Sequence, residues 1–234
     1  HFTLYFKYNI IFNVVQLFVI QIFICCYYII MERNIYDIKD EFQTGDLILF
    51  HTTSKTSWFG QFVQFFTATP YSHVGMILRD PKFTDKKLVG LFFWESSREN
   101  YPDAEDNKKK FGVEIVDLDR MIQGTGTINL YYRKLNFKNG KTIDEDRLNA
   151  IHNVVHNKPY DTVPRDWIEA FFRTDSDPQK TDRFWCSALV GFIYTKLGLM
   201  EEDTDWSILR PDFFSDQGKC ELIDAELGPQ IKLK

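Results

Sequence analysis

A cysteine at the start of an apolar segment is the residue in this sequence best suited to nucleophilic chemistry. Cys186 precedes apolar residues at helical spacing (Leu189, Phe192, Ile193 and Leu197), and Gly198 marks the end of that stripe. With Asp182 or Thr181 as the N-cap, Cys186 would lie in the first helical turn. There the helix dipole and the unpaired N–H groups favour a thiolate. Free cysteines are also among the most buried residue types, so a second interpretation of Cys186 is a core thiol.

Three further side chains could complete a thiol-based active site. A thiolate nucleophile needs a nearby base, a group that orients this base, and donors for the developing oxyanion. His73 could be the base, and Glu95 could accept an imidazole N–H and fix the tautomer. Tyr160 could donate its hydroxyl to the oxyanion, alongside the backbone N–H of Cys186. The structural alternatives are a hydrogen-bonded strand residue for His73, a solvated strand end for Glu95 and ordinary packing for Tyr160.

Two predicted strands would position the imidazole and the carboxylate. The segment 72–78 alternates with period two, and this places His73 and Gly75 on one face. Gly75 leaves room there for a substrate or for the opposing helix. Residues 88–94 form the next predicted strand, and Glu95 closes it. We expect an antiparallel hairpin with a long loop, which would bring Glu95 close to His73.

The remaining pattern predicts an α+β domain. Further strands are expected at 45–50, 113–116 and 127–135, the last of them half-buried, with a charged loop at 100–112. Thr142 and Glu145 form a capping box that would begin a helix ending before Pro159. Aromatic segments at 58–66 and 167–172 are interpreted as core packing, with contact to lipid or an acyl chain as the alternative.

Two histidines on the predicted helix have the spacing of a metal-binding pair. His152 and His156 are four residues apart, but Asn153 follows the first, where a zincin motif has its general-base Glu. We therefore expect solvent-exposed helix histidines here, and predict no metal and no cofactor. No C-x-x-C pair is present that could supply thiolates to a structural zinc site.

Composition limits the class of protein. A chain of 234 residues is long enough for one domain with a substantial core. The net charge of -5 disfavours nucleic-acid binding, because the one basic run, 108–110, lies beside acidic residues. Of the 4 cysteines, Cys25 and Cys26 are adjacent in the apolar N-terminal stretch. The other two, Cys186 and Cys220, form no disulfide framework, which favours a reducing compartment such as the cytoplasm.

An apolar segment precedes the predicted domain. Residues 10–30 carry no charge and have the length of a membrane-spanning helix, and no small-residue cleavage site for a signal peptide follows. The first Met is Met31, at the point where the composition turns polar. Residues 1–31 are therefore interpreted either as a membrane anchor or as translated upstream sequence, with the domain at 32–234. Membrane association is expected only for a true anchor.

Four sequence pieces resemble one enzyme family. Gly45-Asp46-Leu47 and the later His73-Val74-Gly75 resemble the strand pair of NlpC-type papain-like cysteine hydrolases. Pro159-Tyr160 and Cys186-Ser187 resemble the oxyanion tyrosine and the nucleophile of the same family. Here the cysteine follows the histidine, as in the circularly permuted branch of YiiX/YaeF-like amidases, poxvirus proteins and lecithin:retinol acyltransferase relatives.

The resemblance covers roughly residues 44–214 and implies a fold and a set of roles. The fold would be a permuted papain-like domain, with an antiparallel sheet packed against a central helix that carries the cysteine. Cys186 would be the nucleophile, His73 the base, Glu95 its orienting residue and Tyr160 the oxyanion tyrosine. Many hydrolytic members have Asp before the nucleophile, where this sequence has Trp185, and many have His or a neutral polar residue in place of Glu95.

Three functions are open at this level. The first is hydrolysis of an amide, peptide or isopeptide bond through a thioester. The second uses the same thioester as an acyltransferase or lipase that acts on lipid or acyl substrates. The third is a non-catalytic, structural member of the fold, against which the presence of Cys, His, Glu and Tyr together argues.

Overall fold

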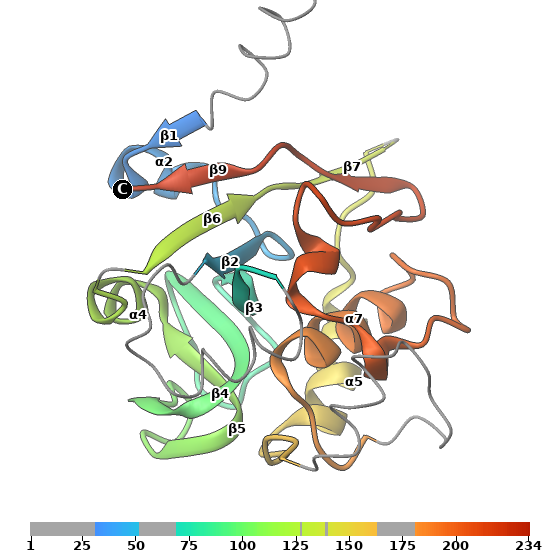
Figure 1. Cartoon of the computed structure of the whole chain (residues 1–234). Helices are drawn as coiled ribbons and strands as arrows, with labels where there is room; N and C mark the ends of the chain where they lie inside the picture. The colour runs from blue at the N-terminus through green and yellow to red at the C-terminus, as the bar shows by residue number, and fades with distance from the viewer. Residues whose placement is uncertain (1–30, 52–68, 127, 139, 163–180) are drawn as a thin grey trace, which may run out of the picture. The chain divides into compact units, whose positions relative to one another are not determined.

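The central feature of the computed structural model is a mostly antiparallel sheet with helices beside it (Figure 1). The structure describes residues 31–51, 69–126, 128–138, 140–162 and 181–234. Arg33–Lys234 form one structural unit, whose sheet has the strand order β9-β6-β2-β3-β4-β5. The strands of this sheet are β2 (Leu47–His51), β3 (Tyr71–Arg79), β4 (Leu91–Pro102), β5 (Lys109–Asp117), β6 (Asn129–Arg133) and β9 (Ile231–Leu233).

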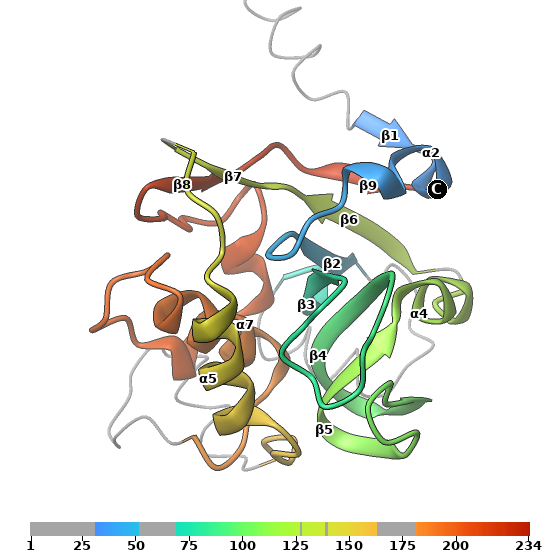
Figure 2. The same cartoon turned by 180° about the vertical axis from the view of Figure 1, so that it is seen from behind.

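Short helices and a second pair of strands complete the described chain. The strand β1 (Met31–Arg33) is the first described element of the chain, and β7 (Leu135–Phe137) pairs with β8 (Ala225–Leu227). The α-helices are α2 (Ile35–Ile38), α4 (Leu118–Gly124), α5 (Glu145–Val155) and α7 (Cys186–Lys196). The 3-10 helices are η1 (Lys39–Glu41), η2 (Trp206–Ile208) and η3 (Pro211–Phe214). The helices α5 and α7 lie side by side in both views (Figure 2).

Both faces of the sheet are covered by apolar side chains. Val74 and Met76 on β3 belong to a cluster that contains most of α7, whereas Ile77 belongs to a second cluster with residues of α2 and α4. The alternation predicted for 72–78 is therefore present. This mixed architecture is compatible with the predicted α+β class.

Several predicted boundaries are wrong because tertiary pairing extends the strands. β4 begins at Leu91 and continues to Pro102, so Glu95 lies inside the strand and does not close it. β5 begins at Lys109, within the predicted charged loop at 100–112. Charged side chains at the end of a hairpin can face solvent, so they do not prevent the backbone from pairing.

The predicted 127–135 strand is shorter and more buried than expected. β6 spans Asn129–Arg133 and both of its faces are covered, so Tyr131 and Arg133 are buried together with the expected apolar residues. Arg133 is satisfied by donating to the backbone carbonyls of Phe214, Ser215, Leu227 and Gly228 at 2.7–2.9 Å. A buried guanidinium is tolerated when its N–H donors are paired in this way.

The helix caps differ from the capping pattern read from the sequence. The N-cap of α5 is Asp144, whose carboxylate accepts the N–H groups of Asp146 and Arg147, so the predicted box beginning at Thr142 is wrong. The predicted stop of α7 is confirmed: Lys196 is its last residue, and Gly198 adopts a φ of 74° just beyond it.

Three sequence predictions fall outside the described residues, namely the apolar segment at 10–30 and the aromatic segments at 58–66 and 167–172. Among the described residues, no helix has the length and apolarity needed to cross a membrane.

The space beside Gly75 is filled by an aromatic ring. A Cβ at Gly75 would lie 2.4 Å from the ring of Phe93, on the neighbouring strand. The expectation that Gly75 leaves room for a substrate or a helix is therefore wrong. Glycine is required at this position because the Phe93 ring packs directly against the backbone of β3.

A methyl group at this position tests the packing. We expect Gly75→Ala to lower the free energy of unfolding by about 1–3 kcal/mol, because Phe93 must leave its present position. The double variant Gly75→Ala/Phe93→Leu should recover part of this loss, because Leu lacks the ring. Urea unfolding followed by circular dichroism measures both effects. A Gly75→Ala protein as stable as the wild type would contradict the assignment.

Candidate active site

The two strands that carry His73 and Glu95 separate in the middle of the sheet. The strands β3 and β4 pair from Arg79, opposite Leu91, to Met76, opposite Trp94. The pairing ends at this second pair. Beyond that point β3 pairs with β2 alone, where His73 lies opposite Phe50, and β4 pairs with β5. The helix α7 contacts both β3 and β4. The first residue of α7 can therefore reach side chains on both strands at the place where they part.

The imidazole of His73 connects a carboxylate and a thiol. Its Nε2 forms a hydrogen bond with Oε2 of Glu95, and the ring also hydrogen bonds with Cys186. The side chain of His73 is 17% exposed and that of Glu95 is 4% exposed. The expected proximity of Glu95 and His73 is thus confirmed. Phe50 and Phe93 pack around the ring, with centroids 4.9 and 6.3 Å from it.

The surroundings of His73 favour its protonated form. Burial by itself lowers the pKa of the imidazole, but negative charge on Cys186, the hydrogen bonds with Cys186 and Glu95, and the charge of Glu95 outweigh it. Together they raise the pKa of His73 to about 10. The imidazole is therefore arranged to hold a positive charge at neutral pH, between Cys186 and Glu95.

Cys186 begins α7. The helix N-cap is Trp185, not Asp182 or Thr181 as predicted, and none of the described side chains caps this helix end. The indole N–H of Trp185 and the hydroxyl of Ser187 both donate to the carbonyl of Leu209, at 3.2 and 2.7 Å. These two bonds hold the residues on either side of Cys186. The first backbone N–H groups of α7 are not taken by a side-chain cap.

Tyr160 reaches the same site from the segment after α5. The backbone of this segment lies between β5 and Phe184, with Tyr160 N donating to Phe111 O at 3.0 Å and Phe184 N donating to Pro159 O at 3.1 Å. The phenol ring stacks on Phe111 at 5.2 Å. Burial, followed by the charges of Cys186, Asp161 and Glu95, raises the pKa of Tyr160 well above its usual value. Its hydroxyl therefore keeps its proton at neutral pH.

A glycine permits this approach. Gly112 on β5 has a φ of 152°, and a Cβ there would lie 2.2 Å from the carbonyl oxygen of Lys158. That carbonyl accepts the N–H of Val113 at 2.8 Å. The segment that carries Tyr160 can therefore pack against β5 only because residue 112 has no side chain.

A second carboxylate beside Glu95 was not among the predicted site residues. Glu114 on β5 lies directly opposite Glu95, is buried, and accepts a hydrogen bond from Ser97 at 2.7 Å. Burial, and next the charge of Glu95, raise the pKa of Glu114 to about 8, so it is mostly protonated at neutral pH. An acidic residue within the apolar run 113–116 is the sequence signal that could have pointed to it.

The structure therefore brings all four predicted residues together. Cys186, His73, Glu95 and Tyr160 come from α7, β3, β4 and the segment after α5. His73 contacts both Glu95 and Cys186, and the charges of Cys186 and Glu95 act on Tyr160. A thiol that contacts a charged imidazole, with a neutral phenol on a segment that bridges to Phe184, is suited to attack on a carbonyl carbon.

The helix histidines are placed differently from the expectation. His152 is buried, so the predicted solvent exposure is wrong for this residue, and His156 is partly exposed. Both contact Oε2 of Glu105, at 3.0 and 3.2 Å. Burial raises the pKa of Glu105, but the hydrogen bond from His152 and the nearby positive groups lower it further, to below its usual value.

No family model matches the sequence, and a comparison with curated proteins finds none with significant similarity.

The pH dependence of stability tests the protonation of Glu114. Its pKa rises from 4.5 to about 8 on folding, so the folded state binds more protons than the unfolded state between these values. Its contribution to the free energy of unfolding therefore falls as the pH rises from about 4.5 to 8, by up to about 5 kcal/mol. Glu114→Gln, which cannot ionise, should remove this fall.

Urea unfolding at pH 5 and pH 8 measures the difference. The wild type should lose more stability between these two values than Glu114→Gln does, by a few kcal/mol on the scale of about 1.4 kcal/mol per pKa unit. Glu226→Gln, at an exposed position, is the matched control and should behave like the wild type. Equal losses in the wild type and Glu114→Gln would show that Glu114 is already ionised in the folded state.

Proposed function

We propose that this chain is a cysteine hydrolase with a permuted papain-like fold of the NlpC type, which cleaves an amide or isopeptide bond through a thioester. The observation that carries the proposal is the His73 imidazole, held between the Cys186 thiol and the Glu95 carboxylate. The order of the four pieces along the chain, with the histidine strand before the cysteine helix, supports the permuted arrangement.

In the proposed acylation step, the Cys186 thiolate attacks the substrate carbonyl carbon and forms a C–S bond. The backbone N–H of Cys186 and the neutral phenol hydroxyl of Tyr160 donate hydrogen bonds to the negatively charged carbonyl oxygen and stabilise it. The C–N bond then breaks, and the His73 imidazolium gives its proton to the leaving amine. The products of this step are the amine and an acyl thioester on Cys186.

In the proposed deacylation step, neutral His73 takes a proton from water as the water oxygen attacks the thioester. The C–S bond breaks, the carboxylic acid leaves, and Cys186 returns as a thiolate beside the imidazolium. Because Nε2 of His73 bonds with Glu95, Nδ1 is left to exchange the proton with sulfur, water and amine. Glu95 fixes the ring orientation in both steps.

Thiol reactivity is the direct test. Burial raises the pKa of Cys220 to about 12, so at pH 7 that side chain is a protonated thiol and a poor nucleophile. We expect iodoacetamide at pH 7 to alkylate Cys186 at least about ten times faster than Cys220, because the imidazolium stabilises the Cys186 thiolate. Peptide mass mapping quantifies each cysteine separately.

Variants of the imidazole separate this effect from simple exposure. His73→Asn should slow the alkylation of Cys186 and leave that of Cys220 unchanged, and Glu95→Gln should have a smaller effect in the same direction. If Cys186 reacts no faster than Cys220, or if His73→Asn reacts as fast as the wild type, the proposed function is wrong.

The fate of the acyl group separates hydrolysis from transfer. With a p-nitrophenyl acyl ester, we expect intact-mass analysis to find one acyl adduct that decays in buffer, because water can complete the cycle. Cys186→Ala should form no such adduct. An adduct that persists in buffer, and disappears only when a primary amine or a phospholipid is added, would replace the hydrolase by an acyltransferase.

A further inference from the structure

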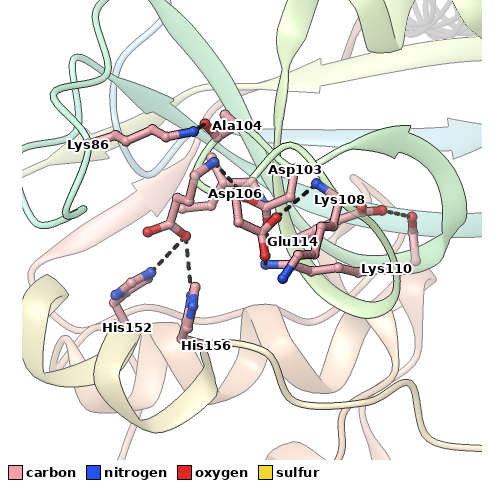
Figure 3. Close-up of polar contacts among 12 residues, drawn as sticks. Lys86, Asp103, Ala104, Asp106, Lys108, Lys110, Glu114, His152 and His156 are labelled. Atoms are coloured by element: carbon pink, nitrogen blue, oxygen red, sulfur yellow. Dashed lines mark hydrogen bonds and ion pairs between the residues drawn. The ribbon is translucent and has the colours of Figure 1, made fainter.

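Two histidines and a glutamate meet at a place separate from Cys186. His152 lies in the last turn of α5 and His156 is the C-cap residue just beyond it, and both face the turn that joins β4 to β5 (Figure 3). The third member, Glu105, comes from that turn, far from α5 in the sequence. One ligand atom from each of the three residues can be chosen so that all lie within 4.8 Å of one another.

The spacing of these atoms suits a tetrahedral metal ion. Zinc binds imidazole nitrogen and carboxylate oxygen at about 2.0–2.2 Å, which places neighbouring ligand atoms of a tetrahedron about 3.3–3.5 Å apart. Oε2 of Glu105 lies 3.0 Å from Nε2 of His152 and 3.2 Å from Nδ1 of His156. Small side-chain movements would therefore bring the three atoms to coordination distances without a change in the backbone.

The surroundings hold the ligands and keep one side open. The side chains of Glu105 and His152 are only 8% and 9% exposed, and His152 packs against Phe83 and Trp94 with ring centroids 5.2 and 6.1 Å away. His156 is 34% exposed, so an ion and a fourth ligand such as water could reach the cluster from its side.

The neighbouring charges do not repel a cation. The ammonium of Lys110, whose charge acts on Glu105, is paired with Asp103 at 2.8 Å and with Asp106 at 3.4 Å. Figure 3 shows Asp103 and Asp106 in the same turn as the carboxylate that faces the histidines, with Lys110 beside them at the start of β5. The positive charge of Lys110 is thus balanced by carboxylates on both sides of Glu105.

We propose that Glu105, His152 and His156 form a binding site for a divalent transition-metal ion of the zinc type, with a fourth position open to water. Two imidazoles four residues apart at the end of a helix, together with one carboxylate, are a ligand set that zinc favours. This replaces the interpretation of the pair as surface histidines. The ion would link α5 to the β4–β5 turn, so its expected role is to stabilise this contact.

Zinc titration of the full chain tests the site. The background is Cys186→Ala, because a thiol, an imidazole and a carboxylate at the other site could also bind zinc. We expect isothermal titration with ZnCl₂ under a phosphine reductant to find a site that His156→Gln and Glu105→Gln each weaken at least about tenfold. Asn153→Ala, an exposed residue on the same helix, is the matched control and should bind as the background does.

Zinc held elsewhere in the chain is common to all variants and cancels in the comparison. Thermal unfolding gives a second readout: zinc should raise the melting temperature of the background and of Asn153→Ala more than that of His156→Gln. Co²⁺ in place of zinc should give visible absorption that His156→Gln reduces. Equal zinc affinity in the background, His156→Gln and Glu105→Gln would overturn the site and leave an ordinary ion pair. This result would not affect the proposal for Cys186.

Discussion

The separation of β3 from β4 is the constraint on which the candidate site depends. Up to Met76 and Trp94 the two strands share hydrogen bonds, and a side chain between them could contact only its own face of the sheet. Beyond this pair, each strand is held by its other neighbour, so the backbone remains paired while the gap opens. The N-terminus of α7 can then bring Cys186 to an imidazole whose strand position is fixed. Phe93 fills the space beside Gly75 and keeps the gap from closing over the ring.

The charges in this gap are mutually dependent. Removing His73 and Glu95 from water is costly, and the cost is offset only because each is the partner of the other. Two carboxylates that lie opposite each other on β4 and β5 repel when both are ionised. Burial and the charge of Glu95 therefore keep Glu114 mostly protonated at neutral pH. A neutral Glu114 adds no second negative charge next to the carboxylate that bonds with His73.

Much of this arrangement could be predicted from local pattern. Period-two alternation placed His73 in a strand, the hairpin brought Glu95 to it, and the helical stripe put Cys186 at the start of a helix. Glu114 was not predicted as a site residue because its position opposite Glu95 depends on the register between β4 and β5, which a single sequence does not specify. The burial of His152 was not predicted for a similar reason, since its partner Glu105 comes from a hairpin turn that is distant in the sequence. The cap of α5 was misplaced because Thr142 and Asp144 are both good caps by type.

The hairpin of β4 and β5 contributes residues both to the site around Cys186 and to the cluster of Glu105, His152 and His156. One of its strands carries Glu95. The other holds the segment of Tyr160, because Phe111 O accepts the N–H of Tyr160 and the N–H of Val113 donates to Lys158 O. The turn of the same hairpin presents Glu105 to α5, and α5 in turn packs against α7, the helix that begins with Cys186. The segment after α5 carries Tyr160, and α7 begins with Cys186, so α5 is connected to both of these residues. Contacts that fix α5 on this turn thus help to hold the thiol, the imidazole and the phenol in register.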